Sequence, residues 1–184
     1  METWIWILIV VLVLIVLWFV LSYNSFVRLR NQIDNAWSQI DVQLKRRFDL
    51  IPNLMNTVKG YMKHEKDTLT EITEARTSFL NAKSIKDKAK AENQLEGALK
   101  TIFAVAENYP QLRASENFMQ LQEELSGTES KIAYSRQHYN DSVQSYENKR
   151  ETFPSNLIAN IFNFGEKEFF KTDEKERENV KVEF

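Results

Sequence analysis

Apolar and polar residues divide the chain into one continuous apolar segment followed by long stretches in which apolar residues recur every three or four positions. The apolar segment extends from Trp4 to Leu21, WIWILIVVLVLIVLWFVL, and contains no charged side chain. At about 1.5 Å per residue, a helix of this length approaches the roughly 30 Å hydrocarbon thickness of a bilayer. We therefore expect residues 4–21 to form a transmembrane helix in contact with the lipid bilayer.

Aromatic residues lie at both ends of this segment, where membrane proteins commonly place them at the membrane–water interface. They are Trp4, Trp6, Trp18, Phe19 and Tyr23. The alternative is a removable signal peptide, but the segment lacks the cationic start and the small-residue cleavage site of such peptides. The first alanine of the chain is Ala36. The sequence therefore favours a permanent anchor.

Charged residues beside the segment predict its orientation. Glu2 is the only charged side chain before it, whereas Arg28 and Arg30 follow it. Basic residues accumulate on the cytoplasmic side of membrane helices, so we expect the rest of the chain to lie in the cytoplasm and the N-terminus outside. The opposite topology is the alternative.

Two amphipathic patterns follow the anchor, in residues 29–62 and 69–80, with apolar residues at helical spacing. Pro52 interrupts the first pattern without shifting its apolar register. This predicts either a helix kinked at Pro52 or a new helix that starts there. The break between the two patterns falls near His64, at a position that the sequence does not define.

Two further amphipathic patterns occupy residues 95–125 and 132–153. The third should bend at Pro110, and Gly127 marks a corner before the fourth. Burying four apolar faces joined by short connections requires packing them together, so the sequence predicts an all-α helical bundle. The expected organisation is an anchor in residues 1–24, a helical bundle in residues 25–165 and a charged, flexible tail in residues 166–184.

Composition limits the kinds of protein that this chain can be. With 184 residues there is room for the anchor and one domain, and a net charge of -2 argues against nucleic-acid binding. The chain has no cysteine, which excludes disulfides, thiolate metal sites and thiol nucleophiles. Only four glycines and three prolines are present, as expected for a helical fold.

One arginine in each of three amphipathic patterns falls among the apolar positions. These are Arg47, Arg76 and Arg136, and the carboxylates that could pair with them are Glu65, Glu107 and Glu129. A buried guanidinium needs a carboxylate partner, so we expect a structural polar layer that aligns the helices. Alternatively, the arginines lie at the bundle rim with their charged ends in water, or they line a cavity for a small anionic ligand.

A cluster of large apolar residues follows Pro154 near the C-terminus. It contains Leu157, Ile161, Phe162, Phe164, Phe169 and Phe170. This segment could cap one end of the bundle. It could instead be an interaction segment for another subunit, a partner protein or the bilayer interface, because exposed apolar clusters usually mark contacts.

Residues with catalytic spacing are not evident. His64 and His138 form neither a His-Glu-x-x-His motif nor a Glu-x-x-His pair, and the chain has no glycine-rich phosphate loop. The sequence therefore predicts no catalytic residue, no metal ligand and no cofactor, and it favours a protein that is not an enzyme.

Two long motifs resemble the LemA family of bacterial membrane proteins. They are DVQLKRRFDLIPNLMNTVKGYMKHE in residues 41–65 and AENYPQLRASENFMQLQEELSGTESKIAYSRQHYN in residues 106–140, followed by Phe153 and Pro154. Family motif positions match at Arg46, Arg47, Pro52, Arg136 and Tyr139. The resemblance implies an N-terminal transmembrane helix that carries an antiparallel four-helix bundle in the bacterial cytoplasmic (inner) membrane. It implies no enzyme activity, and a relative in the magnetosome membrane suggests membrane organisation or scaffolding.

Two functional hypotheses follow from these observations. In the first, the protein is a membrane-anchored scaffold that forms homo-oligomers or recruits a membrane-protein partner. In the second, it is a sensor or regulatory subunit of a membrane protein, such as a membrane protease, and binds a small anionic ligand among its core-facing arginines. Neither hypothesis involves nucleic acid.

Overall fold

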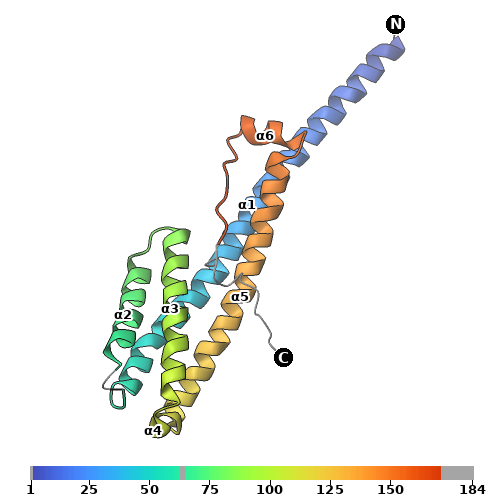
Figure 1. Ribbon diagram of the computed structural model, residues 1–184. Helices are drawn as coiled ribbons and strands as arrows, with labels where there is room; N and C mark the ends of the chain where they lie inside the picture. The colour runs from blue at the N-terminus through green and yellow to red at the C-terminus, as the bar shows by residue number, and fades with distance from the viewer. Residues whose placement is uncertain (1, 63–64, 171–184) are drawn as a thin grey trace, which may run out of the picture. The chain divides into compact units, whose positions relative to one another are not determined.

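The computed structural model describes residues 2–62 and 65–170 of the chain. The described residues form six α-helices and no β-strand, which confirms the predicted all-α class (Figure 1). The helices are α1 (Glu2–Val58), α2 (Lys66–Asn81), α3 (Ile85–Ala106), α4 (Pro110–Arg113), α5 (Glu116–Glu151) and α6 (Ser155–Ile161).

Helix α1 contains 57 residues and continues without a break from the apolar segment through Pro52. The alternative in which a new helix starts at Pro52 is therefore wrong. Proline removes one backbone hydrogen bond, but Phe48, Ile51 and Leu54 lie on one buried face before and after it. Continued burial of this face favours one uninterrupted helix, and a kink at Pro52 stays a prediction.

Helix α3 begins at a cap that the apolar pattern did not reveal. The Ser84 hydroxyl accepts a hydrogen bond from the Asp87 backbone N–H at 3.0 Å and donates one to the Asp87 carboxylate at 2.7 Å. Such a cap satisfies an N–H group that the first helical turn would otherwise leave without a partner. Three residues separate α2 from α3, and the two helices lie side by side (Figure 1).

The predicted bend at Pro110 and the predicted corner at Gly127 are both wrong. Pro110 does not bend a continuous helix, because α3 ends at Ala106 and Pro110 is the first residue of α4. A proline fits this position because the first helical N–H has no partner within the helix. Gly127 is not a corner, since it lies inside α5. A helical glycine costs about 1 kcal/mol, and burial of Leu125 and Ile132 on the same helix offsets this cost.

The described residues divide into two compact units, the first in residues 2–38 and 137–169 and the second in residues 39–136 and 170. Each unit has its own buried apolar residues. In the first these include Phe26, Ile33, Ala36, Tyr139, Val143, Tyr146, Ile158 and Phe164. In the second they include Ile40, Leu44, Phe48, Ile51, Leu54, Ile72, Phe79, Leu95, Leu99, Ile102, Phe118, Leu125 and Ile132. Apolar residues of all four amphipathic patterns are thus buried, whereas Leu80 and Phe153, at the ends of two of them, are exposed.

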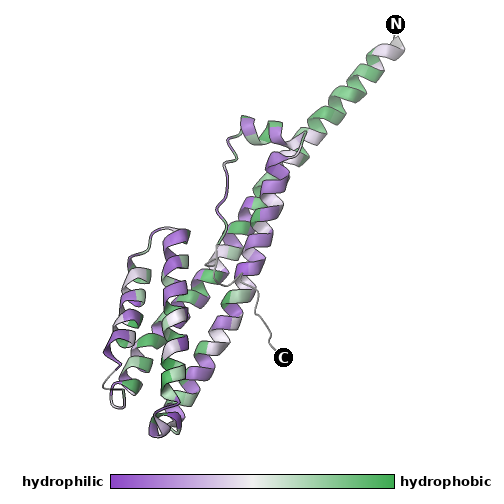
Figure 2. Ribbon diagram, in the orientation of Figure 1, coloured by the Kyte–Doolittle hydropathy of each residue, from purple (hydrophilic) through white to green (hydrophobic). Residues whose placement is uncertain are grey.

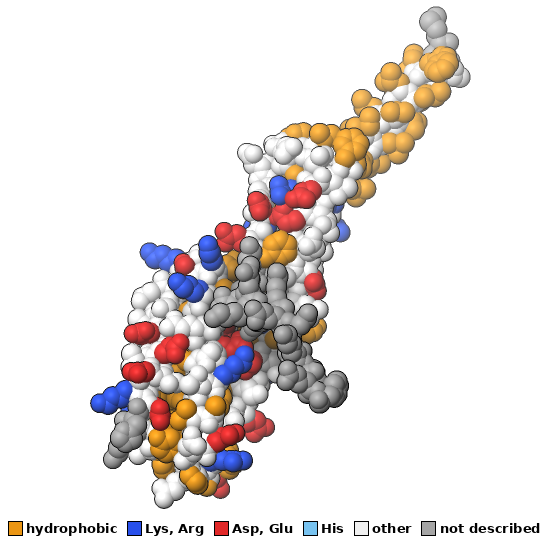
Figure 3. All heavy atoms as spheres, in the orientation of Figure 1, with side chains coloured by type: hydrophobic (Ala, Val, Ile, Leu, Met, Phe, Trp, Pro, Cys, Tyr) orange, Lys and Arg blue, Asp and Glu red, His pale blue; other side chains and the backbone are white. Residues whose placement is uncertain are grey.

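The apolar N-terminal segment is exposed along its length. Trp4 is 75% exposed and Leu21 is 67% exposed. Figure 2 shows hydrophobic residues along this part of α1, and Figure 3 shows their side chains uncovered on the face towards the viewer. Among the described residues, α1 is the one helix long and apolar enough to cross a membrane. Because exposed apolar surface is unfavourable in water by about 25 cal/mol per Å², lipid is the environment that this segment suits.

Candidate functional site

A buried arginine lies in the second unit. Arg47 is only 1% exposed, although guanidinium groups are almost never fully buried without a partner. Its position on α1 explains its burial, because Leu44 and Ile51 on the same helical face are also buried. The α-helix therefore directs the Arg47 side chain into the core.

Arg47 pairs with one carboxylate from α3 and one from α5. Its Nη1 donates a short hydrogen bond to Glu92 Oε1, and its Nη2 donates a longer one to Glu129 Oε2 at 3.5 Å. The Glu92 side chain is 1% exposed and that of Glu129 is 45% exposed. Because water screens exposed charges, the bond to Glu92 is the stronger of the two. This ion pair connects α1 to α3 inside the second unit.

The carboxylates around Arg47 have different protonation properties. Burial raises the pKa of Glu92, and Arg47 opposes this shift by stabilising the carboxylate. Burial also acts to raise the pKa of Glu96, but a 2.7 Å hydrogen bond from Lys100 and the nearby positive charges outweigh it and lower that pKa. Of these two carboxylates, Glu92 therefore depends more on Arg47 to remain ionised.

Arg136 on α5 belongs to the same group of charges. It is half-buried, and its positive charge acts on both Glu92 and Glu96. Its guanidinium carbon lies 5.8 Å from the centre of the Phe170 ring, a distance typical of a cation–π contact. Among the described residues, Arg47 Nε, Glu92 Oε2 and Arg136 Nη1 are buried atoms without a hydrogen-bond partner. These atoms reduce stability because burial removes their contact with water.

The structure brings some of the predicted polar residues together and leaves others apart. Arg47 and Glu129 are hydrogen-bonded, whereas Glu65 instead accepts a hydrogen bond from the Tyr109 hydroxyl at 3.2 Å. Glu107 is exposed at the C-terminal end of α3. Arg76 is half-buried and lines an open groove of about 210 Å³ beside Phe79.

Sequence reasoning missed Glu92, the main partner of Arg47. Glu92 lies three residues before Leu95 and seven before Leu99, and all three are buried. This is the spacing of one helical face. Extending the apolar pattern of residues 95–125 backwards by one turn could therefore have identified Glu92 as a core-facing carboxylate.

The C-terminal segment after α6 is attached to the first unit by aromatic residues. The Phe164 ring stacks on Phe26, with 4.8 Å between the ring centres. The Tyr146 hydroxyl donates to the Gly165 carbonyl at 2.9 Å, and the Tyr139 hydroxyl donates to the Glu168 carbonyl at 2.8 Å. Burial raises the pKa of Tyr139 to about 12. The extended segment is thus held along its length.

The residues predicted as an interaction segment differ in exposure. Phe164 and Phe170 are buried, whereas Leu157 is 50% exposed, Ile161 is 65% exposed and Phe162 is 43% exposed. Leu157 and Ile161 are four residues apart on α6, so they lie on one side of this helix. Phe169 is 38% exposed. The exposed apolar surface of this segment is therefore centred on α6.

Comparison with known proteins identifies the family. The sequence model of the LemA family matches residues 36–184, which include Arg47, Glu92, Glu129 and Arg136. The chain belongs to the LemA family. It is similar to "Protein LemA" of Metamycoplasma hominis, with 32% identity over 161 residues that cover 85% of this chain and 72% of the relative.

Two magnetosome proteins are more distant relatives of this LemA-family chain. "Magnetosome protein MamQ 2" of Paramagnetospirillum magneticum is 24% identical over 178 residues, covering 83% of this chain and 65% of the relative. "Magnetosome protein MamQ" of Magnetospirillum gryphiswaldense is 22% identical over 177 residues, covering 82% and 65%. Together with the exposed apolar segment of α1, these LemA-family relationships indicate a membrane-associated protein.

Proposed function

We propose that this LemA-family protein is a membrane-anchored helical scaffold of the bacterial cytoplasmic membrane, without enzymatic activity, that acts through self-assembly or recruitment of a membrane-protein partner. The observation that carries this proposal is the continuity of α1. The exposed apolar segment and the buried face that holds Arg47 belong to the same helix. The continuity of α1 supports a membrane anchor that is joined directly to the helical domain.

The proposed organisation is an anchor in residues 1–24, a helical domain in residues 25–165 and a charged tail in residues 166–184. Within the domain we propose an antiparallel four-helix arrangement. Residues 171–184, most of the tail, lie outside the described part of the chain. Arg28 and Arg30, which follow the apolar segment, support an orientation with the N-terminus outside and the domain in the cytoplasm.

The proposed contact surface is the exposed apolar side of α6, formed by Leu157 and Ile161. Apolar side chains grouped on an exposed helix commonly mark protein contacts. The opposite side of α6 is occupied, because Ile158 and Ala159 are buried. One side of α6 therefore holds the helix in the first unit while the other remains accessible to a second copy or a partner.

The alternative function, a sensor that binds a small anion among core-facing arginines, has less support. An anion would have to compete with Glu92 and Glu129, which already accept hydrogen bonds from both terminal nitrogens of Arg47. Removing a buried arginine from its carboxylate costs about 3–5 kcal/mol. The paired state of Arg47 therefore supports an architectural role.

Crosslinking in native membranes tests the scaffold proposal. A photoreactive residue placed at Phe153, which is 73% exposed, would capture proteins that lie beside α6. We expect reproducible adducts to a second copy or to one membrane protein, identified by mass spectrometry. Ile161→Glu should remove these adducts because it places a charge on the contact surface. Val42→Glu is the matched control, because Val42 is 63% exposed and lies on α1 rather than on α6.

Two results would contradict the proposal. One is a monomer without reproducible protein adducts at any exposed position tested. The other is equal loss of adducts in Ile161→Glu and Val42→Glu, which would show that the adducts do not depend on α6. Recovery of a small anion with the purified wild-type protein, but not with Arg47→Met, would favour the sensor function instead.

A further inference from the structure

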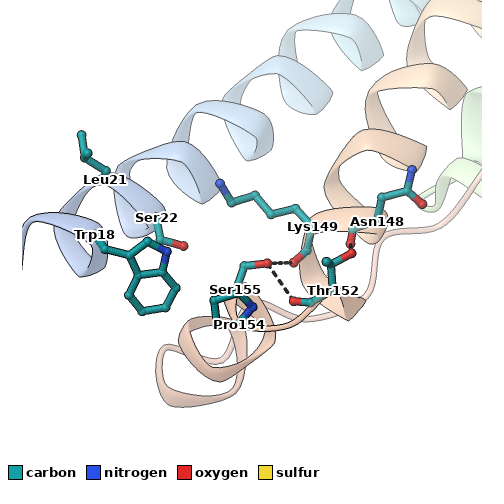
Figure 4. A pocket seen from close by; sticks show the side chains of 8 residues that line it. All are labelled: Trp18, Leu21, Ser22, Asn148, Lys149, Thr152, Pro154 and Ser155. Atoms are coloured by element: carbon teal, nitrogen blue, oxygen red, sulfur yellow. Dashed lines mark hydrogen bonds between the residues drawn. The ribbon is translucent and has the colours of Figure 1, made fainter. Parts of the chain in front are cut away.

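An open groove lies in the first unit where the apolar segment of α1 ends (Figure 4). Its volume is about 480 Å³. One wall comes from α1 and the other from the end of α5 and the turn before α6. The lining residues are Trp18, Leu21, Ser22, Asn148, Lys149, Thr152, Pro154 and Ser155.

Lys149 gives this groove a positive charge that has no carboxylate partner among the described residues. The neighbouring carboxylates are already engaged, because Arg150 donates to Glu147 at 2.5 Å and to Glu151 at 3.4 Å. The Lys149 ammonium lies 5.3 Å from the centre of the Phe26 ring. Figure 4 shows its side chain extending from α5 towards α1. An anion in the groove would therefore reach an available cation.

Partial burial makes the Lys149 ammonium favourable for an anionic ligand. The side chain is half-buried, and loss of contact with water lowers the pKa of Lys149. A desolvated ammonium gains more from a nearby anion than one surrounded by water, because water screens the attraction less. Trp18 and Ser22 add an indole N–H and a hydroxyl group to the groove lining. Both groups can donate hydrogen bonds to phosphate oxygens.

The apolar side of the groove identifies the class of ligand. Leu21 is 67% exposed, and the exposed apolar surface of α1 continues from it towards Trp4. Trp18 and Leu21 belong to the last turn of the apolar segment, at the expected depth of the lipid headgroups. A free phosphate would leave this apolar wall uncovered. A molecule with a phosphate and two acyl chains could occupy both parts of the groove.

The walls of the groove are held in place by aromatic contacts within the first unit. Phe162, directly after α6, lies with its ring centre 5.7 Å from that of Phe19 and 4.8 Å from that of Tyr23. Phe19 lies between the lining residues Trp18 and Leu21, and Tyr23 directly follows Ser22. The Ser155 hydroxyl also donates to the Lys149 carbonyl at 2.7 Å and the Thr152 carbonyl at 2.8 Å. The groove is thus formed before a ligand arrives.

We propose that this groove is a phospholipid-binding site, in which the Lys149 ammonium binds the headgroup phosphate while the acyl chains lie along the apolar surface of α1. The site rests on the proposed anchorage of residues 4–21 in the bilayer. It adds a specific lipid contact to that anchorage, and it positions the first unit against the membrane surface.

Photocrosslinking of the full-length protein tests this site. The protein is reconstituted in phosphatidylcholine vesicles that contain phosphatidylglycerol with a photoreactive group near its phosphate. We expect the lipid adduct on peptides that contain residues 18–22 or 148–155. Lys149→Gln should reduce this adduct by about tenfold or more, since it removes the charge-assisted contact to the headgroup phosphate. Lys149→Arg should retain it.

Arg28→Gln is the matched control, because Arg28 is an exposed cation on α1 that does not line the groove. The adduct should survive this change and should persist in excess inorganic phosphate. Equal losses in Lys149→Gln and Arg28→Gln would overturn the proposal in favour of general surface attraction. Competition by inorganic phosphate would overturn it in favour of a free-anion site.

The membrane fraction separates this inference from the proposed function. If Lys149→Gln stays in the membrane and the wild-type protein gives no adduct in either peptide, the lipid site is wrong and the anchorage stands. If the wild-type protein is released by an alkaline wash without detergent, the anchorage is wrong and the lipid site falls with it.

Discussion

The Arg47→Met substitution tests whether the buried ion pair stabilises the helical domain. Methionine is shorter than arginine, but it is unbranched and flexible and can occupy the apolar surroundings of the Arg47 stem. The main effect is to leave Glu92, which is 1% exposed, without its cation. Breaking a buried pair by removing one partner costs about 3–5 kcal/mol. The bond to Glu129 adds little to this cost, because that side chain is 45% exposed.

This cost should depend on pH, because Glu92 can take up a proton. Burial already raises the pKa of Glu92 from 4.5 in the wild-type protein, and loss of Arg47 removes the main influence that lowers it. A carboxyl group with a raised pKa favours folding below its unfolded pKa, and this contribution is lost as the pH rises through its folded pKa. The destabilisation caused by Arg47→Met should therefore be small near pH 4.5 and should increase as the solution becomes neutral.

Urea unfolding of the full-length protein in detergent micelles, followed by circular dichroism, measures this effect. We expect a loss of about 3–5 kcal/mol in the free energy of unfolding. In a thermal melt of the same samples, this corresponds to a decrease in Tm of about 6–20 °C for a domain of this size. Arg46→Met is the control, because Arg46 is exposed and should change stability by less than about 0.5 kcal/mol. The double variant Arg47→Met/Glu92→Met should recover most of the loss, since it leaves no unpaired charge in the core.

Two outcomes would refute this reasoning. If Arg47→Met and Arg46→Met have the same stability, the ion pair does not stabilise the fold. If the double variant is as unstable as Arg47→Met, the loss comes from packing rather than from the unpaired Glu92 carboxylate. A loss that is constant with pH would likewise contradict the role assigned to Glu92.

Three further predictions address a helix, a hydrogen bond and the orientation. Gly127→Ala should increase the free energy of unfolding by about 1 kcal/mol, because Gly127 is helical and an added Cβ would meet no atom within 4 Å; a decrease would contradict its place inside α5. Tyr139→Phe should lower the free energy of unfolding by about 1 kcal/mol at neutral pH, because it removes the hydrogen bond to the Glu168 carbonyl. It should also remove an ionisation near pH 12 from an absorbance titration, and the extra stability of the wild-type protein should vanish as the pH rises through that value. An unchanged titration would refute the raised pKa of Tyr139. Because the chain has no cysteine, single cysteines report orientation without background: in spheroplasts, a membrane-impermeant maleimide should label Thr3→Cys, and it should label Gln122→Cys only after lysis. The reverse labelling pattern would invert the proposed topology.

Local sequence patterns predicted the helices better than their ends. The amphipathic pattern of residues 29–62 correctly predicted a buried face, which includes Ile40, Leu44 and Phe48. The predicted corner at Gly127 and the predicted bend at Pro110 were wrong. Both residue types weaken helices, yet Gly127 lies within α5 and Pro110 begins α4. A glycine or proline adds a cost of a few kcal/mol at most, and whether a helix ends there depends on the packing of the residues beside it.

The candidate polar site likewise has one feature that the sequence predicted and one that depends on packing. Position on an apolar face was enough to predict that Arg47 points inwards, because helical geometry sets the direction of a side chain. Its partner could not be chosen among the many glutamates of the chain. Glu92 is 45 residues away in the sequence, and only the packing of α3 against α1 decides which carboxylate reaches the guanidinium.

The sequence by itself determined the helical class and the apolar segment that suits a bilayer, since both depend on residue type and spacing within one helix. The tertiary structure alone decided which of the C-terminal aromatic residues are buried. Phe164 lies against Phe26 while Phe162 stays partly exposed, although both are phenylalanines two positions apart. Their difference arises from contacts between segments more than 100 residues apart in the chain, and such contacts leave no periodic signal in the local sequence.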